Sequence, residues 1–498
     1  MTRSGLIGES REHFVSRWLF LRLLGLVYLF AFLSLFGQVA GLIGPNGVMP
    51  ADRFLAEAHR EWGGQACWMA PTVFWFGAGA LALKSVCLAG CVGGLLVALD
   101  VAAVFCLPLC WALYLSLMST SGGFLNFQWD SLLLETGFLA VFLSNLRLKP
   151  RLRDATPPSL VVIWLFRLLL FRLMFSSGWV KLTSGDLSWR HLTALRYHYE
   201  TQPLPLWTSW YVHHLPPWWQ TFSVAAVLFI ELVVPFLIFG PKKIRSVGCW
   251  ILAALQFLIM ATGNFGFFNP LSMALCFAAM DDAAFPARLR RALTPSENDG
   301  GRAARAWPAW VIVPVAALLL TLSAESLYTQ AMRVRAPGVL TQACRVFEPY
   351  CLVNHYGLFA VMTTTRMEII IEGSNDGVTW VPYEFRYKPG DPNRRPALVA
   401  PFQPRLDWQM WFAALGTFRD NPWFINLCVR LLQGSPDVLG LLGRNPFAGA
   451  PPRFIRASAF EYHFSNPEVR RNTGAWWVRG RKGLYCPSFS LQDVEGAG

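Results

Sequence analysis

The chain has 498 residues, of which 54% are hydrophobic, 14% are aromatic and only 15% are charged, and its mean hydropathy is +0.38. About a quarter of the residues of a soluble domain are charged, so this composition excludes an ordinary soluble protein. It also excludes a disordered chain, because so apolar a sequence collapses or inserts into a bilayer. The net charge of +13 is divided among short basic clusters between apolar runs, which favours a membrane-topology signal over nucleic-acid binding.

Long apolar runs occupy the first two thirds of the chain. The first run, 18–44, exceeds the apolar core of a signal peptide and lacks a small-residue cleavage site, which predicts an uncleaved span. Several runs have the roughly 20 residues that a helix needs to cross a bilayer, although two are marginal. We therefore predict a polytopic α-helical membrane protein with about nine spans, near 18–44, 71–99, 101–118, 125–143, 160–180, 219–240, 246–263, 266–281 and 308–328.

Basic loops between these runs predict the orientation of the spans. When the spans alternate, the basic loops fall on one side, which is cytoplasmic by the positive-inside rule; they are 144–158, 241–245 and 282–307. The resulting organisation has a cytoplasmic segment 1–17, a multi-span domain 18–328 with external loops near 45–70 and 181–218, and an external domain 329–498. The chain contains no Asn-x-Ser/Thr glycosylation acceptor and is rich in arginine, which favours a bacterial cytoplasmic membrane over an endoplasmic reticulum membrane.

The predicted external domain is rich in β-strands. The segments 366–373 and 378–387 carry β-branched and aromatic residues on either side of an Asp-Gly turn, which is a strong hairpin signal. A second pair of strands is predicted at 453–464 and 475–481, and the segments 408–415 and 422–432 have helical patterns. We predict a β-sandwich-like domain with a helical insert.

Four of the 11 cysteines lie in this domain, at Cys344, Cys351, Cys428 and Cys486. An even number of cysteines in an oxidising compartment permits two disulfides, and Cys344 with Cys351 would close the shortest loop. The sequence does not decide the connectivity. It contains no Cys-x-x-Cys, which disfavours a thioredoxin-type thiol exchanger.

Ionisable residues inside apolar runs form a second group of candidates. They are Asp130, Glu135, Arg167, Arg172 and Glu231. A charge at membrane depth is costly and usually faces a polar interior, so we expect the two arginines to pair with the first two carboxylates across adjacent helices. Structural ion pairs that fix the helix order are one interpretation, and a polar cavity that holds a ligand head group is the other.

The segment 175–214 combines lysine, histidine, tyrosine and carboxylates with aromatic residues at the external membrane face. Lys181, if desolvated there, is a candidate general base, with His198 as its companion. The alternative is a lysine that reaches the interface within an aromatic belt. The histidine spacing matches no common zinc motif, and hydrolase, metalloprotease and nucleotide motifs are absent, so we predict no metal and no cofactor.

Several strings taken together resemble the lipase maturation factor family. They include IGPNG at 43–47, FQWD at 127–130, HYETQPLP at 198–205, GNF at 263–265 and PRLDWQMWF at 404–412, and they follow one another over nearly the whole chain. The resemblance implies a multi-pass membrane protein, resident in the animal endoplasmic reticulum, that assists the folding of secreted lipases. It also implies a lumenal C-terminal domain that binds the client. Our client-binding candidates in that domain are Trp408, Trp411 and Phe412.

The membrane half is also distantly similar to vitamin K-dependent gamma-carboxylase, through the string GWVKL at 178–182. That resemblance implies a membrane enzyme using Lys181 as a base on a lipid or quinone-like substrate, and it is our alternative hypothesis. The main prediction is a non-enzymatic maturation factor or chaperone. Its expected partners are a secreted client protein and membrane lipids, and nucleic acid is not among them.

Overall fold

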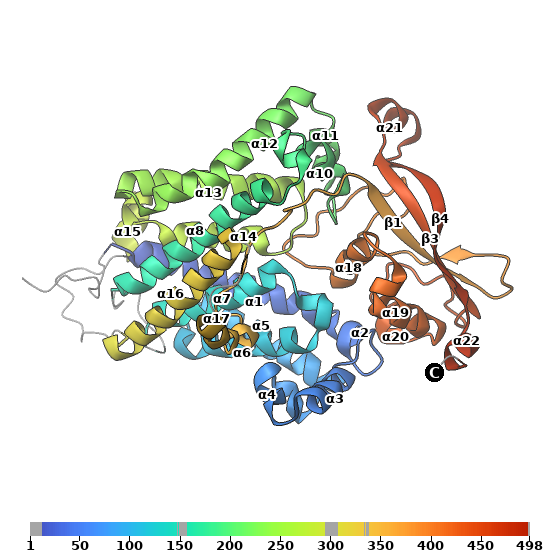
Figure 1. The fold of residues 1–498 in the computed structure, drawn as a ribbon, viewed down its shortest axis with the longest axis horizontal. Helices are drawn as coiled ribbons and strands as arrows, with labels where there is room; N and C mark the ends of the chain where they lie inside the picture. Colours follow the sequence, from blue (N-terminus) through green and yellow to red (C-terminus); the bar gives the residue numbers. More distant parts are fainter. Residues whose placement is uncertain are drawn as a thin grey trace, which may run out of the picture.

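The computed structural model describes residues 12–146, 148, 157–293, 307–332, 334 and 338–496, and it is mainly helical (Figure 1). Within these residues, seven helices are long and apolar enough to cross a membrane. They are α1 (Phe14–Phe36), α5 (Ala80–Ala98), α6 (Ala103–Thr120), α8 (Leu160–Thr183), α12 (Pro217–Leu232, with a 3-10 turn continuing the span to Phe239), α13 (Lys242–Thr262) and α16 (Ala309–Met332). The prediction of a polytopic α-helical membrane protein is confirmed. The predicted segment 1–17 and the basic loops 144–158 and 282–307 lie partly outside the described residues.

Two of the nine predicted spans form shorter helices. α7 (Gln128–Leu143) has 16 residues and α14 (Phe268–Ala279) has 12, so they are about 24 and about 18 Å long against roughly 30 Å of hydrocarbon. Most residues of both helices are buried, and α14 packs against α1, α8 and α13. Because other helices enclose them, their polar ends are satisfied by protein and need not reach the bilayer surfaces.

Helices α1 and α5 pack closely because glycines face each other across their interface. A Cβ atom on Gly25 would lie 2.7 Å from the carbonyl oxygen of Gly94, and a Cβ on Gly94 would lie 2.9 Å from that of Gly25. Small residues of this kind let membrane helices approach backbone to backbone. The interface therefore depends on two residues whose side chains contribute no hydrophobicity of their own.

The strands of the C-terminal part (residues 338–496) form one antiparallel sheet in the order β2-β1-β3-β4. Its strands are β1 (Arg366–Ser374), β2 (Val381–Pro382), β3 (Phe454–Phe464) and β4 (Trp477–Phe489). The predicted hairpin and the predicted strand pair near 453–464 and 475–481 are both present, and Ile370 of β1 lies opposite Ser458 of β3.

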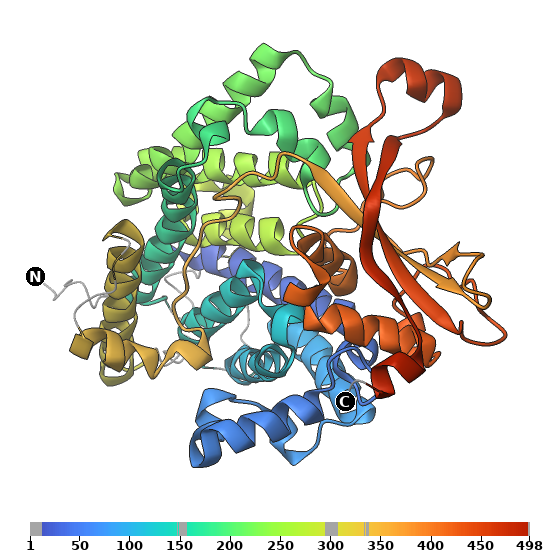
Figure 2. The same cartoon turned by 45° about the vertical axis from the view of Figure 1, so that its right-hand side comes forward.

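The predicted sandwich-like arrangement is corrected to a single sheet within the described residues, because helices take the place of a second sheet. These helices are α18 (Arg405–Ala413), α19 (Pro422–Leu432) and α20 (Pro436–Leu439), and they lie between the sheet and the long helices (Figures 1 and 2). Their apolar residues join the core that also contains Ile369 and Ile371 of β1. Two further short helices, α21 (Pro467–Thr473) and α22 (Leu491–Glu495), flank β4.

Short helices connect the long ones and cover their ends. They are α2 (Val39–Ile43), α3 (Ala51–Trp62), α4 (Ala66–Met69), α9 (Leu187–Arg190), α10 (Leu195–Thr201), α11 (Trp207–His213), α15 (Ala287–Leu293) and α17 (Gly338–Arg345). Helices α10 and α11 lie beside the sheet, where the C-terminal part meets the helical part, residues 12–332 (Figure 1). This junction brings together most of the residues that the sequence singled out.

Candidate functional site

The strings at 127–130 and 404–412 meet at the junction through a buried ion pair. Arg405, in the first turn of α18, donates from its two Nη atoms to the carboxylate oxygens of Asp130 at 2.7 and 2.8 Å. Neither side chain is exposed to solvent. Tyr114 Oη donates to Asp130 Oδ1 at 2.5 Å and accepts from Arg405 at 3.2 Å. This two-pronged pair ties α18 to α7 with the geometry in which arginine binds carboxylates most strongly.

A second buried carboxylate, Glu135, lies five residues further along α7. It accepts from Arg172 Nη1 of α8 at 2.6 Å, from Tyr356 Oη at 2.7 Å and from the backbone N–H of Asn354 at 3.0 Å. Tyr356 and Asn354 belong to the segment that leads into the sheet. Glu135 therefore holds both a neighbouring membrane helix and the start of the C-terminal part.

The string at 198–205 is held by the sheet. Arg366 of β1 is buried and donates to the carbonyl oxygens of Glu200 and Pro203 at 2.8 and 2.9 Å. The Glu200 carboxylate lies 2.9 Å from His463 Nδ1 of β3, and Trp411 Nε1 donates to Thr201 O at 2.8 Å. Backbone carbonyls that point away from a helix end need such donors when they are buried.

The structure forms one pair between the two arginines and two carboxylates that we expected to pair, and it gives the other arginine and the other carboxylate different partners. Of the predicted pairs, it contains Arg172 with Glu135. Arg167 instead lies 3.6 Å from Asp281 and donates to the carbonyl oxygen of Ala279 at 3.2 Å, so it lies at the end of α14. The partner of Asp130 is Arg405, which the sequence placed in the C-terminal domain.

Beside the Asp130–Arg405 pair lies an apolar groove of about 360 Å³, which we call the aromatic groove. Its walls include all three client-binding candidates, namely Trp408, Trp411 and Phe412, together with Asn126, Phe127, Gln128, Trp129, Pro203, Phe265, Gly357, Leu358, Phe359, Ala360, Val361, Thr363 and Leu415. Trp408 packs edge-on against Trp129 with ring centroids 4.8 Å apart. The groove is thus built by both parts of the molecule.

The three candidates have different surroundings within the groove. Trp408 and Trp411 are 3% and 7% exposed, whereas Phe412 is 41% exposed. Two more apolar side chains of the groove, Leu415 and Val361, are 50% and 67% exposed. Leu415 and Val361 were not predicted from the sequence, because an isolated leucine or valine gives no signal until the fold places it beside an exposed phenylalanine.

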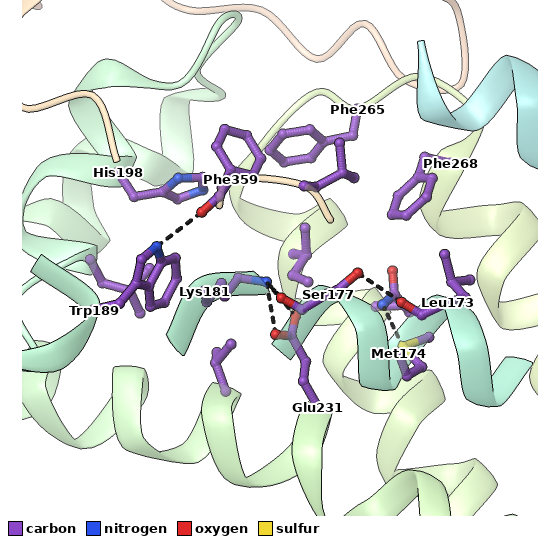
Figure 3. Close-up of a pocket in the computed structure, with 15 residues that line it drawn as sticks. Leu173, Met174, Ser177, Lys181, Trp189, His198, Glu231, Phe265, Phe268 and Phe359 are labelled. Atoms are coloured by element: carbon purple, nitrogen blue, oxygen red, sulfur yellow. Dashed lines mark hydrogen bonds and ion pairs between the residues drawn. The ribbon is translucent and has the colours of Figure 1, made fainter. Parts of the chain in front are cut away.

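A separate cavity of about 90 Å³ contains both residues of the alternative hypothesis (Figure 3). Lys181 Nζ lies 2.7 Å from Glu231 Oε2, and both side chains are buried. His198 lines the same cavity, and burial together with the nearby Lys181 charge lowers its pKa from 6.5 to about 4. Phe265, Leu358 and Phe359 line this cavity and the aromatic groove alike.

The remaining predicted site is the disulfide. Cys344 and Cys351 are both free cysteines, so the disulfide proposed between them is not formed in this structure. The part of the chain that the structure describes contains no group of three His, Cys, Asp or Glu residues able to hold a metal ion.

A protein-family model described as the lipase maturation factor transmembrane domain matches residues 15–287 of this chain. A second model, described as the lipase maturation factor C-terminal domain, matches residues 352–487. The chain belongs to the lipase maturation factor family. The two matches divide between residues 287 and 352, at the approach to the sheet. The Arg405–Asp130 ion pair and the hydrogen bond from Arg366 to the Glu200 carbonyl oxygen therefore each join one family domain to the other.

Individual relatives match over almost the whole chain. Lipase maturation factor 1 of Bos taurus is 36% identical over 97% of this chain and 90% of its own length. Lipase maturation factor 1 of Homo sapiens is 36% identical over 97% and 89%, and Lipase maturation factor 2 of Rattus norvegicus is 36% identical over 96% and 84%. No solved structure matches this chain. These comparisons give no support to the carboxylase-like alternative.

Proposed function

We propose that this protein is a membrane-resident maturation factor that assists the folding of secreted lipases, and that it does so without catalysing a covalent reaction. The names of its relatives support lipases as the client class. The observation that carries the proposal is the aromatic groove, which is open to solvent and lined by both family domains. An exposed apolar surface of this kind is typical of a protein-interaction site.

The client, in this proposal, contacts the exposed rim of the groove. Trp408 and Trp411 are buried and fix the groove wall, whereas Phe412, Leu415 and Val361 present apolar surface to a partner. A maturation factor needs higher affinity for the incompletely folded client than for the finished one. Apolar residues that a lipase buries only in its folded state meet this requirement, since they are available to the groove before folding and unavailable afterwards.

We also propose that the groove faces the lumen or the periplasm. Arg245 of the basic loop 241–245 pairs with Asp281 at 2.8 Å, and the Asp282 carboxylate accepts from the backbone N–H of Phe14 at 2.8 Å, so this basic residue and the start of α1 share one end of the helical part. The sheet and helices α18, α19 and α20 lie at the other end (Figure 1). The positive-inside rule makes the basic end cytoplasmic. A bacterial source remains a prediction, and the relatives named above are mammalian.

A client-secretion assay with matched surface variants tests this proposal. Phe412→Ala and Leu415→Ser remove apolar area from the groove rim, and each should lower client affinity by about tenfold, since an interface residue of this kind contributes more than about 1 kcal/mol. Leu484→Ser on β4 is the control, because Leu484 is 56% exposed and does not line the groove. Equal secretion from all three variants at normal abundance would refute the groove as the client site.

A further inference from the structure

The cavity around Lys181 has no role in the proposed function, although the buried Lys181–Glu231 ion pair lines it. Its floor is formed by side chains of α8, α12 and α13, and its roof by Trp189, Leu195, His198 and Phe359. Figure 3 shows Lys181, Glu231 and His198 around one space, with the rings of Phe265 and Phe359 beside the histidine. Apart from a few groups, the walls are apolar.

The lysine of the ion pair in this cavity has protein acceptors for all of its hydrogen-bond donors. Lys181 Nζ donates to Glu231 Oε1 and Oε2 at 2.9 and 2.7 Å and to Ser177 O at 3.2 Å, which uses its three protons. Glu231 accepts hydrogen bonds from Lys181 alone among the described residues. An ionised carboxylate has about four acceptor sites, so Glu231 retains acceptor capacity toward the cavity.

His198 contributes a second group with unused capacity. No described residue makes a hydrogen bond with either nitrogen of its ring, which lies between Phe265 and Phe359 with ring centroids 6.3 and 4.8 Å away. Its lowered pKa keeps the imidazole neutral at neutral pH, with one N–H donor and one bare nitrogen acceptor. His198 is half-buried and lines the cavity, so a ligand that displaces water from the cavity is favoured when it supplies a hydrogen-bond partner to this ring.

The chemistry of these groups selects the head of a ligand. A carboxylate or phosphate would compete with Glu231 for Lys181 and leave a buried charge unpaired. An ammonium group would be repelled by Lys181, which already neutralises Glu231. An uncharged hydroxyl group fits, because it accepts from the His198 N–H and donates to a free acceptor site of Glu231.

The apolar walls of the cavity favour a ligand whose hydroxyl group is attached to an alkyl chain. Leu173, Leu195, Phe268 and Leu358 supply an apolar lining. Val227 of α12 and Ile259 of α13 are half-buried and form the wall between the two helices. Neighbouring residues on these helices, Phe229 and Leu258, are 58% and 61% exposed on the surface that a spanning helix turns toward lipid. An alkyl chain therefore has an apolar approach from the bilayer.

We propose that this cavity binds the hydroxyl end of an uncharged membrane lipid, such as a monoacylglycerol or a long-chain alcohol, between Lys181–Glu231 and His198. The bound lipid is a ligand, and no bond in it is made or broken. The proposal concerns a site distinct from the groove rim that contacts the client, so the two can fail independently.

Photo-labelling tests the proposal on the full-length chain in phosphatidylcholine nanodiscs. The probe is a monoacylglycerol with a photoreactive acyl chain, and the competitors are an unlabelled monoacylglycerol, a long-chain alcohol, the fatty acid and its methyl ester. The two hydroxyl lipids should compete at least about tenfold better than the acid and the ester, which is the effect of about one hydrogen bond. Equal competition by all four, or labelling no higher than in empty nanodiscs, would overturn the proposal.

Three variants locate the label. His198→Phe keeps a ring but loses both hydrogen-bonding atoms, and it should weaken competition by the alcohol about tenfold while leaving the ester unchanged. Val227→Trp fills the cavity and should abolish labelling, whereas Phe229→Trp, on the exposed side of α12, should retain it. Undiminished labelling of Val227→Trp would show that the lipid binds elsewhere. If a variant fails to fold, the competition experiment on the unmodified chain still tests the proposal.

Discussion

Replacing Arg405 by methionine should weaken the attachment of α18 to α7. The substitution leaves the Asp130 carboxylate fully buried without its cation, which costs about 3–5 kcal/mol for a buried pair. Two donors remain, because Tyr114 Oη lies 2.5 Å and Phe127 N lies 3.3 Å from the carboxylate. We therefore expect the lower end of the range, about 3 kcal/mol, as a loss in the free energy of unfolding measured by denaturant titration in micelles.

A double variant separates the ion pair from the loss of arginine packing. Arg405→Met with Asp130→Asn removes the buried charge but keeps an oxygen for Tyr114, so it should be at least about 1.5 kcal/mol more stable than the Arg405→Met variant. Arg444→Met is the control, because the Arg444–Glu384 pair is 73% and 44% exposed and should contribute less than about 1 kcal/mol. Strictly additive effects of the two substitutions at 405 and 130 would refute the reasoning.

Three further outcomes follow from the structure. Lys181→Met should destabilise the chain by about 3 kcal/mol, and adding Glu231→Gln should recover part of that loss, as unfolding of both variants will report. The pKa of His198 is lowered from 6.5 to about 4 in the folded chain, so between these values the unfolded chain binds a proton that the folded chain does not. The free energy of unfolding at pH 5 should therefore be about 2 kcal/mol lower than at pH 7. The His198→Phe variant should lack this part of the pH dependence. Thiol labelling of the denatured, non-reduced chain should modify both Cys344 and Cys351, and protection of the two would restore the predicted disulfide.

Hydropathy predicted the long helices well, because a helix that faces lipid must be apolar over a fixed length. The same rule does not hold for α7 and α14, which other helices enclose and which are therefore free to be short. Strand pattern predicted β1, β3 and β4 but not their assembly into one sheet. A second sheet or a layer of helices buries an apolar face equally well, and α18 and α19 fill that position here.

The site was predictable in its residue types and not in its pairings. Asp130 was recognised as a charge that needs a partner, but Arg405 lies 275 positions away and no periodicity joins the two. Trp408, Trp411 and Phe412 were predicted from one string. That the two tryptophans are buried while Phe412 is exposed depends on how α7 and the segment around Val361 pack against α18. Long-range contacts of this kind are set by the packing of whole elements.

The central claim is that a folding lipase contacts the aromatic groove, and site-specific photo-crosslinking in secreting cells tests it most directly. A photoreactive amino acid placed at Phe412 should cross-link a co-expressed lipase while that lipase is still maturing, and the same amino acid at Leu484 should not. Cross-links from position 484 as strong as those from position 412, or none from 412 in cells whose lipase still requires this protein, would contradict the account.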